Sequence, residues 1–146
     1  AMCVREQLPY WDCKILATDL DSAVLNEAKT GVYDNLFGVP KRFESKYCEK
    51  SQNHVNQYCM ACELKNMVTF KQLNLLRPWP MKGSFDAIFC RNVLIYFNEE
   101  TKQEIIRRFY ALLKPGGYLF IGHSESLQNS DTNFNLLGQT IYQRSV

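Results

Sequence analysis

The stretch from Phe85 to Phe97, FDAIFCRNVLIYF, constrains the fold more than any other part of the chain. Its first half, Phe85 to Cys90, is nearly all apolar, follows a Gly-Ser turn signal and is too short for a typical helix. This pattern predicts a strand buried on both faces, as in parallel sheets. Arg91 and Asn92 then place a cation and an amide at the carboxyl end of that strand, where open α/β sheets bind ligands. The pattern alone also fits a buried strand followed by an ordinary polar turn.

A second candidate ligand group lies at the end of an earlier strand. Residues Lys14 to Thr18, KILAT, predict a short strand that ends in Asp19, and Asp21 or Ser22 then caps a helix that Gly31 terminates. In nucleotide-binding βαβ units, a carboxylate at such a strand end binds the cofactor ribose. Asp19 fits that role, whereas Asp21 is better explained as the helix cap. An aspartate that merely ends a strand is the alternative for Asp19.

The glycine-rich loop that normally precedes such a carboxylate does not fit upstream. That loop lies about 20 residues or more ahead of the acidic residue. Here Asp19 is only the nineteenth residue, and the first glycine in the chain is Gly31. We therefore expect part of a longer protein, whose first strand and glycine-rich loop are absent from this chain.

The remaining pattern alternates strands and helices. Met67 to Leu73 predicts a strand near the sheet edge, and Asn98 predicts the cap of a long amphipathic helix. Pro115-Gly116-Gly117 is expected to end that helix, before a buried strand at Tyr118 to Ile121 and a hairpin at Phe134 to Arg144 around Gly138.

Two segments give weaker signals. Leu36 to Lys65 lacks clear periodicity, with a short helix expected at Lys41 to Cys48 and one or two strands at Val55 to Leu64. The tripeptide His123-Ser124-Glu125 follows a predicted strand, but a catalytic triad does not fit because Ser124 lacks a GxSxG elbow.

Composition indicates a globular, cytoplasmic protein. The chain has 146 residues, 46% of them hydrophobic, which is the size of one domain that can bury a core. A net charge of +2 with scattered basic residues argues against nucleic acid as a partner. No apolar run approaches the ~20 residues of a membrane span, so no membrane insertion is expected. The amino-terminal residues also lack a signal-peptide pattern.

The six cysteines allow two interpretations. Cys59 and Cys62 form a CxxC, and with Cys48 and His54 they could make a Cys3His zinc site. The chain has no second CxxC and no glycine-bearing knuckle, so free thiols are the preferred interpretation and no metal is predicted.

Several motifs in order resemble one family. ILATDLDSAVLNEAKTGVY, NLL, RNVLIYF and RRFYALLKPGGYLFIGHSESL are similar to segments of the CheR family, the chemotaxis-receptor glutamate methyltransferases. The resemblance spans about Lys14 to Tyr142 and is weakest between Leu36 and Lys65. It implies an α/β, Rossmann-like class I methyltransferase sheet of strand order 3-2-1-4-5-7-6, ending in an antiparallel hairpin. Residues 1–146 would then form a partial methyltransferase domain with a small inserted subdomain at about residues 36–66.

The resemblance also implies a reaction and its residues. The cofactor is S-adenosylmethionine, S-adenosylhomocysteine is the product, and the substrate is a glutamate side chain in the cytoplasmic domain of a chemoreceptor. The implied cofactor-binding residues are Asp19, Asn74, Leu75, Arg91 and Asn92, and the implied catalytic residues are Arg91 and Tyr96. In some family members the inserted subdomain binds a receptor peptide, but here the expected turn, KSQNHVN, lacks a glycine.

Other interpretations stay open. The chain could be a non-catalytic fragment or binding module that retains half of a cofactor pocket. Methylation of a small molecule or nucleic acid is disfavoured, because base methyltransferases of this fold commonly carry an Asn-Pro-Pro-aromatic motif where this chain has RNVLIYF.

The absent first strand predicts two free strand edges. The strands at Lys14 to Thr18 and Phe85 to Cys90 would flank an empty lane, and buried unpaired backbone groups cost about 1–3 kcal/mol each. The two strands could pair directly, but we expect self-association of the chain instead. Binding of the cofactor by the isolated chain is expected to be weak.

Overall fold

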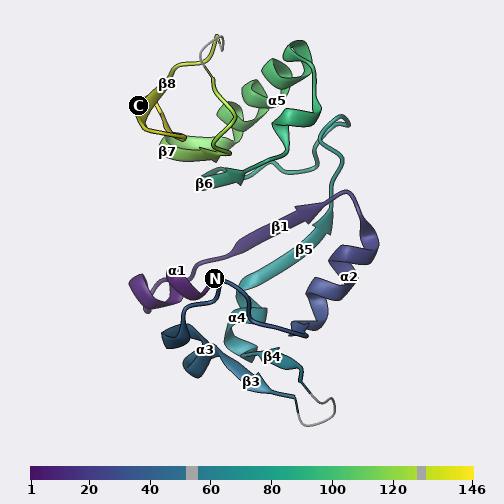
Figure 1. Cartoon of the computed structure of the whole chain (residues 1–146). Coiled ribbons are helices and arrows are strands. Elements are labelled where there is room, and N and C mark those ends of the chain that lie inside the picture. The colour runs from purple at the N-terminus through teal and green to yellow at the C-terminus, as the bar shows by residue number, and fades with distance from the viewer. Residues whose placement is uncertain (52–55, 128–130) are drawn as a thin grey trace. The chain divides into compact units, whose positions relative to one another are not determined.

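A computed structural model of the chain describes residues 1–51, 56–127 and 131–146. The chain divides into two compact units, Ala1–Asn74 and Leu75–Val146 (Figure 1).

The first unit contains two small sheets. One sheet pairs β1 (Ile15–Asp19) with β5 (Val68–Gln72) in parallel, with Ile15 opposite Val68 and Asp19 opposite Gln72. The other sheet is antiparallel and has the strand order β2 (Val32–Tyr33), β4 (Tyr58–Met60), β3 (Cys48–Lys50). The elements are α1 (Met2–Gln7), β1 (Ile15–Asp19), α2 (Ser22–Thr30), β2 (Val32–Tyr33), α3 (Lys41–Tyr47), β3 (Cys48–Lys50), β4 (Tyr58–Met60), α4 (Cys62–Met67) and β5 (Val68–Gln72).

The local signals around β1 and α2 are confirmed. Asp21 is the N-cap of α2, because its carboxylate accepts a hydrogen bond from the amide of Ala23 at 2.7 Å. Gly31 ends the helix in the left-handed region at φ 64°, which glycine adopts without steric cost. β1 begins at Ile15 and includes Asp19, one residue later at each end than the pattern predicts.

The strand prediction for Val55 to Leu64 is only partly confirmed. The helix α3 forms where it was expected, and β4 forms at Tyr58–Met60, but Cys62–Met67 is a helix. Leu64 and Met67 lie one helical turn apart and both pack into the core of this unit, which favours a helix over an extended chain. Val55 lies outside the described residues.

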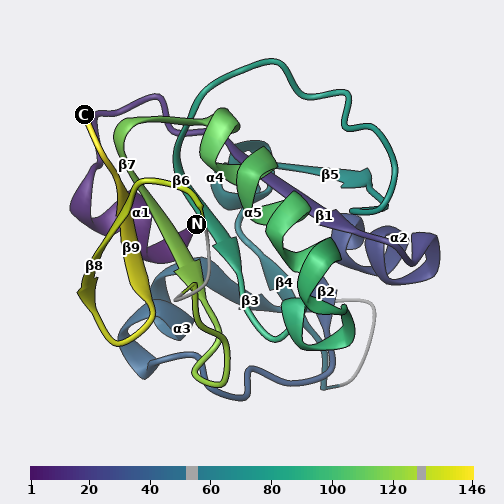
Figure 2. The same ribbon diagram turned by 90° about the horizontal axis from the view of Figure 1, so that it is seen from above.

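The second unit is one mixed sheet with a helix on it. The sheet order is β6-β7-β9-β8, in which β6 and β7 are parallel and the other pairs are antiparallel (Figure 2). The elements are β6 (Phe85–Cys90), a 3-10 turn η1 (Leu94–Tyr96), α5 (Glu99–Leu112), β7 (Leu113–Ile121), β8 (Phe134–Gly138) and β9 (Ile141–Arg144). The predicted strand at Phe85 to Cys90 and the terminal hairpin are therefore confirmed.

The core of this unit lies between α5 and one face of the sheet. Asn98 caps α5 as predicted, with its side chain accepting from the amide of Thr101 at 2.9 Å. Ile105, Ile106 and Phe109 of the helix are buried in one cluster with Leu119 and Ile121 of β7. This apolar stripe, spaced at three and four residues, positions the loop between β6 and α5.

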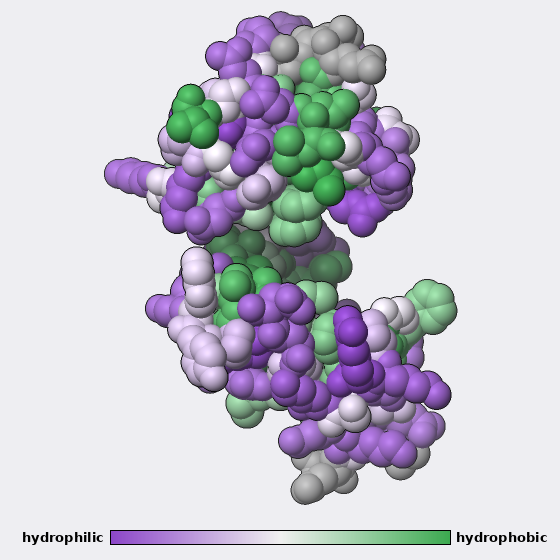
Figure 3. All heavy atoms as spheres, turned by 90° about the vertical axis from the view of Figure 1, so that its left-hand side faces the viewer, coloured by the Kyte–Doolittle hydropathy of each residue, from purple (hydrophilic) through white to green (hydrophobic). Residues whose placement is uncertain are grey.

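The prediction that β6 is buried on both faces is wrong. Cys90 is buried, but Phe89, the residue before it in the strand, is 70% exposed. Its ring stacks on that of Phe120 with centroids 4.3 Å apart, yet no helix of the described unit covers that face. Apolar surface, in green, is also visible on the face of this unit that Figure 3 shows. Leu136 and Leu137 of β8 are exposed and add to the apolar surface of the unit.

The boundary between α5 and β7 also differs from the prediction. The strand begins at Leu113, so Pro115-Gly116-Gly117 lies inside β7 instead of ending the helix. The pairing register with β6 shifts in this region, from Phe85 opposite Leu113 to Ala87 opposite Tyr118. Gly116 takes up the irregularity at φ 77°.

β1 and β6 each have a single neighbour in the described part of the chain, as do the other edge strands β2, β3, β5 and β8. β1 pairs with β5, and β6 pairs with β7. The order β6-β7-β9-β8 matches the 4-5-7-6 portion of the expected sheet, and the β1–β5 pair matches its 2-3 portion. No helix in the described part of the chain is both long enough and apolar enough to span a membrane.

Candidate functional site

The carboxyl ends of β1 and β5 bring Asp19 and Asn74 to the same edge of the first unit. The amide of Leu73 donates to the carbonyl of Asp19 at 2.9 Å, and the side-chain amide of Gln72 donates to the carbonyl of Leu20 at 2.8 Å. Asn74 follows directly. These two bonds extend the strand pairing beyond the ladder and tie the two strand ends together.

Asp19 is exposed and its carboxylate is held in place by its own loop. Its Oδ1 accepts from the amide of Asp21 at 2.9 Å. Oδ2 makes no hydrogen bond within the described residues. A carboxylate with one oxygen fixed and the other open is suited to accept from a sugar hydroxyl.

Leu75 begins the second unit, and its carbonyl anchors the segment that follows β5. This oxygen accepts from the indole of Trp79 and from the guanidinium of Arg108, both at 3.2 Å. Arg108 also lies over the Trp79 ring, 5.5 Å from its centroid, and donates to the carbonyl of Arg77. The segment after Asn74 is thus attached to α5.

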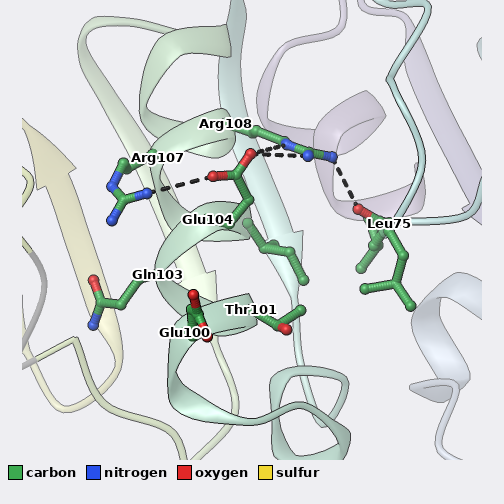
Figure 4. Close-up of a pocket in the computed structure, with 9 residues that line it drawn as sticks. Leu75, Glu100, Thr101, Gln103, Glu104, Arg107 and Arg108 are labelled. Carbon is green, nitrogen blue, oxygen red and sulfur yellow. Dashed lines mark hydrogen bonds and ion pairs between the residues drawn. The ribbon is translucent and has the colours of Figure 1, made fainter.

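Beside this contact lies a hollow of about 590 Å³ along α5 (Figure 4). Three of its charged side chains are engaged with one another, since Glu104 pairs with both Arg107 and Arg108. None of the predicted site residues except Leu75 lines it, so we assign the ligand site elsewhere.

Arg91, Asn92 and Tyr96 are presented together on one loop after β6. Arg91 and Asn92 are exposed, and Tyr96 is 79% exposed at the end of the turn η1. Asn92 adopts φ 58°, a left-handed conformation that few non-glycine residues take. Leu94, buried between them, fixes the loop to the core. The structure therefore shows the three predicted side chains at the carboxyl end of a parallel strand.

Sequence reasoning missed the residue that holds this loop. Glu125, in the turn after β7, is buried at 8% exposure and accepts hydrogen bonds from the amides of Asn92, Val93 and Ile95. Its negative charge also acts on the neighbouring Cys90, although burial is the larger cause that raises the pKa of that thiol to about 12. Cys90 therefore stays protonated and packs as a small apolar side chain.

No zinc site is formed by the residues that the structure describes. All six cysteines are free thiols, and no three potential ligands are grouped to hold a metal in the described ranges. Cys48 faces Met60 across β3 and β4 with its sulfur 3.8 Å from the thioether. His54, the fourth potential ligand, lies outside the described residues.

These observations define an α/β protein whose predicted site residues lie at the carboxyl ends of parallel strands, where open α/β sheets commonly bind ligands. Residues 1–143 match the family described as CheR methyltransferase, SAM binding domain. The chain belongs to this family, which confirms the resemblance seen in the sequence. The family's cofactor is S-adenosylmethionine.

Curated relatives agree with this assignment. The chain is 44% identical over 138 residues to a chemotaxis protein methyltransferase of Escherichia coli, covering 90% of this chain and 48% of that protein. It is 41% identical over 137 residues to a probable chemotaxis protein methyltransferase of Rhizobium etli, covering 91% of this chain and 51% of that protein. The chain thus spans about half the length of the curated relatives that it matches.

Proposed function

We propose that the protein transfers a methyl group from S-adenosylmethionine to glutamate side chains in the cytoplasmic domain of a chemoreceptor. The observation that supports this most strongly is the exposed loop after β6, which presents Arg91, Asn92 and Tyr96 within a CheR-family domain. The protein would act in the cytoplasm, where that receptor domain lies.

The residues of each unit fit parts of the cofactor. In the first unit, Asp19 would bind the ribose hydroxyls through its open carboxylate oxygen, and the amide of Asn74 would pair with the adenine edge. In the second unit, Leu75 would cover an adenine face, and Arg91 and Asn92 would line the cofactor pocket. The donor and acceptor types match a nucleoside, which carries hydroxyls and a heteroaromatic base.

The reaction needs positioning more than acid–base chemistry. A glutamate carboxylate, with an ordinary pKa of about 4.3, is ionised at neutral pH, so no general base is required. S-adenosylmethionine supplies a methyl group on a sulfonium for in-line transfer to that carboxylate. The planar guanidinium of Arg91 would orient the acceptor carboxylate, and the hydroxyl of Tyr96 would donate to it.

Methyl transfer to an isolated receptor domain tests this proposal. The whole protein is incubated with S-adenosylmethionine labelled in its methyl group and with the cytoplasmic domain of a chemoreceptor. We expect label in the receptor that mild alkali releases as methanol, because a glutamate methyl ester is base-labile. Replacing the acceptor glutamates by glutamine should remove the label. Label that resists alkali, or no label at all, contradicts the proposal.

Two finer points belong to the same proposal. The antiparallel sheet β2-β4-β3 together with α3 would form the small subdomain that the family inserts at about residues 36–66.

The isolated chain would self-associate, which the single neighbour of β6 and the exposed Phe89 support. Light scattering of the isolated chain tests this, and a monomer at all concentrations contradicts it.

A further inference from the structure

One buried carboxylate holds the backbone of the loop that carries the proposed catalytic residues. Glu125 Oε1 accepts from the amides of Val93 at 3.1 Å and Ile95 at 3.3 Å. Its Oε2 accepts from the amide of Asn92 at 3.3 Å and from that of Gly122. Arg91 and Tyr96 flank the three loop amides, so one side chain, 30 residues or more away in sequence, fixes the backbone between them.

The chemistry of these contacts requires a carboxylate. An ionised glutamate is an acceptor only, with two oxygens that can each receive two donors. Bonds from neutral amides to an ionised acceptor are stronger than neutral ones, and at 8% exposure water screens them little. A glutamine of the same shape would place its own N–H donors against some of the four backbone donors.

Gly122, next to Glu125, leaves room for the loop after β6 to approach closely. Gly122 is buried, and a Cβ added there would lie 2.6 Å from Asn92 Oδ1 and 2.7 Å from Glu125 Oε2. The loop therefore approaches β7 as closely as glycine allows. This approach accompanies the left-handed φ of 58° at Asn92, a conformation that asparagine adopts more readily than most non-glycine residues and that the contact of its amide with Glu125 stabilises.

We propose that Glu125 is a positioning residue for methyl transfer. It lies behind the loop, and it sets the direction in which Arg91 and Tyr96 leave the backbone. The inference rests on the proposed function, because positioning has a catalytic meaning only if this loop contacts the cofactor or the acceptor. A residue that only stabilised the fold would leave the activity of each folded molecule unchanged.

The test compares three substitutions in the same turn. Glu125→Gln removes the charge and keeps the shape, whereas Leu127→Ala truncates a buried side chain of the same core and leaves the four amide contacts in place. In the whole protein, kcat per folded molecule should fall about a hundredfold for Glu125→Gln. Leu127→Ala should lose stability with kcat nearly unchanged, and Glu125→Asp, which keeps the charge, should recover part of the rate.

Amide hydrogen exchange provides a second readout that does not depend on activity. In Glu125→Gln the amides of Asn92, Val93 and Ile95 should exchange about tenfold faster or more, while those within α5 keep their protection. If wild-type protein transfers no methyl group, the proposed function fails, and hydrogen exchange still decides whether Glu125 holds the loop. Unchanged exchange at these three amides, or equal loss of kcat in Leu127→Ala and Glu125→Gln, overturns the inference.

Discussion

The loops at the ends of β1 and β6 carry the two sets of predicted ligand groups, and the contacts that fix those groups differ. In the loop after β1 the carboxylates are fixed locally, since Asp19 accepts from the amide of Asp21 and Asp21 accepts from that of Ala23, while Gln72 of β5 holds the backbone carbonyl of Leu20. The loop after β6 is held by Glu125, which accepts from the amides of Asn92 and Val93 and lies more than 30 residues further along the chain than either.

This difference suggests that the two loops have different roles in binding the cofactor and in transferring the methyl group. A short, self-capped turn presents one carboxylate and suits a fixed ligand such as a ribose. A loop clamped from behind keeps several side chains in register, which in-line methyl transfer requires. Changes at Asp19 should therefore affect mainly cofactor affinity, whereas changes at the end of β6 should affect the transfer step as well as cofactor binding.

The largest effect is expected from Arg91→Ala. Removal of the guanidinium that orients the acceptor carboxylate should abolish methyl transfer to the receptor, measured with labelled cofactor. Circular dichroism should show a folded protein, because Arg91 is exposed. Arg77→Ala serves as the control, since Arg77 is also exposed and its carbonyl, not its side chain, contacts Arg108. Turnover like that of wild type in Arg91→Ala would show that Arg91 does not orient the acceptor carboxylate for methyl transfer.

A smaller effect is expected at the end of β1. Asp19→Asn removes charge-assisted hydrogen bonds worth about 1.5–3 kcal/mol, so cofactor affinity should fall at least about tenfold. Equilibrium dialysis of the whole protein with labelled S-adenosylmethionine measures this. Asp21→Asn is the matched control, because asparagine caps helices as well as aspartate does. Equal dissociation constants for Asp19→Asn and wild type would leave Asp19 as a residue that only ends a strand.

The N-cap of α5, which follows the β6 loop, is expected to contribute to the stability of the fold. Asn98→Ala should lower the free energy of unfolding by about 1 kcal/mol, because the amide of Thr101 loses its acceptor. Urea denaturation of the whole protein measures this loss, and Asn98→Asp, which keeps a capping oxygen, should restore most of it. A loss far above 2 kcal/mol would indicate that Asn98 also holds the β6 loop.

The smallest effect concerns a second carboxylate whose hydrogen-bond partners lie far away in sequence. Glu6 of α1 accepts from Lys46 and from the hydroxyl of the buried Tyr47 at 2.6 Å. The hydrogen bond from Lys46, and then that from Tyr47, lower the pKa of Glu6 below its usual 4.5. Its contribution to stability is therefore complete above about pH 4.5 and is lost as the pH falls through the lowered pKa.

Glu6→Gln tests this directly. Thermal unfolding followed as a function of pH should show a shallower acid loss of stability in the variant than in wild type, while Asp12→Asn, a change at an exposed aspartate, should leave the wild-type slope. Identical slopes for Glu6→Gln and wild type would show that the contact does not persist in solution.

The sequence predicts what short-range physics determines. Apolar runs and caps locate β6 and α5, and the cap at Asp21 with the terminal Gly31 locates α2. A strand-end acid and a strand-end cation indicate the ligand edges of the sheets. These features depend on residues a few positions apart.

The sequence does not reveal what depends on distant partners. The pattern of β6 does not show that Phe89 is exposed, because the composition of a strand does not reveal whether a helix covers each face. Proline and two glycines at residues 115–117 look like a helix end, yet they lie in a strand because β6 pairs beside them. The role of Glu125 cannot be predicted from the sequence, because a lone glutamate after a strand has no distinguishing pattern and only its four amide contacts reveal it.

Calorimetric titration of the whole wild-type protein with S-adenosylhomocysteine tests the central claim most directly. The account predicts saturable binding of one product molecule per protein, competed by S-adenosylmethionine and weakened in Asp19→Asn but not in Asp21→Asn. A titration without binding heat at several temperatures, with the protein folded by circular dichroism, would contradict the assignment of the strand ends to this cofactor.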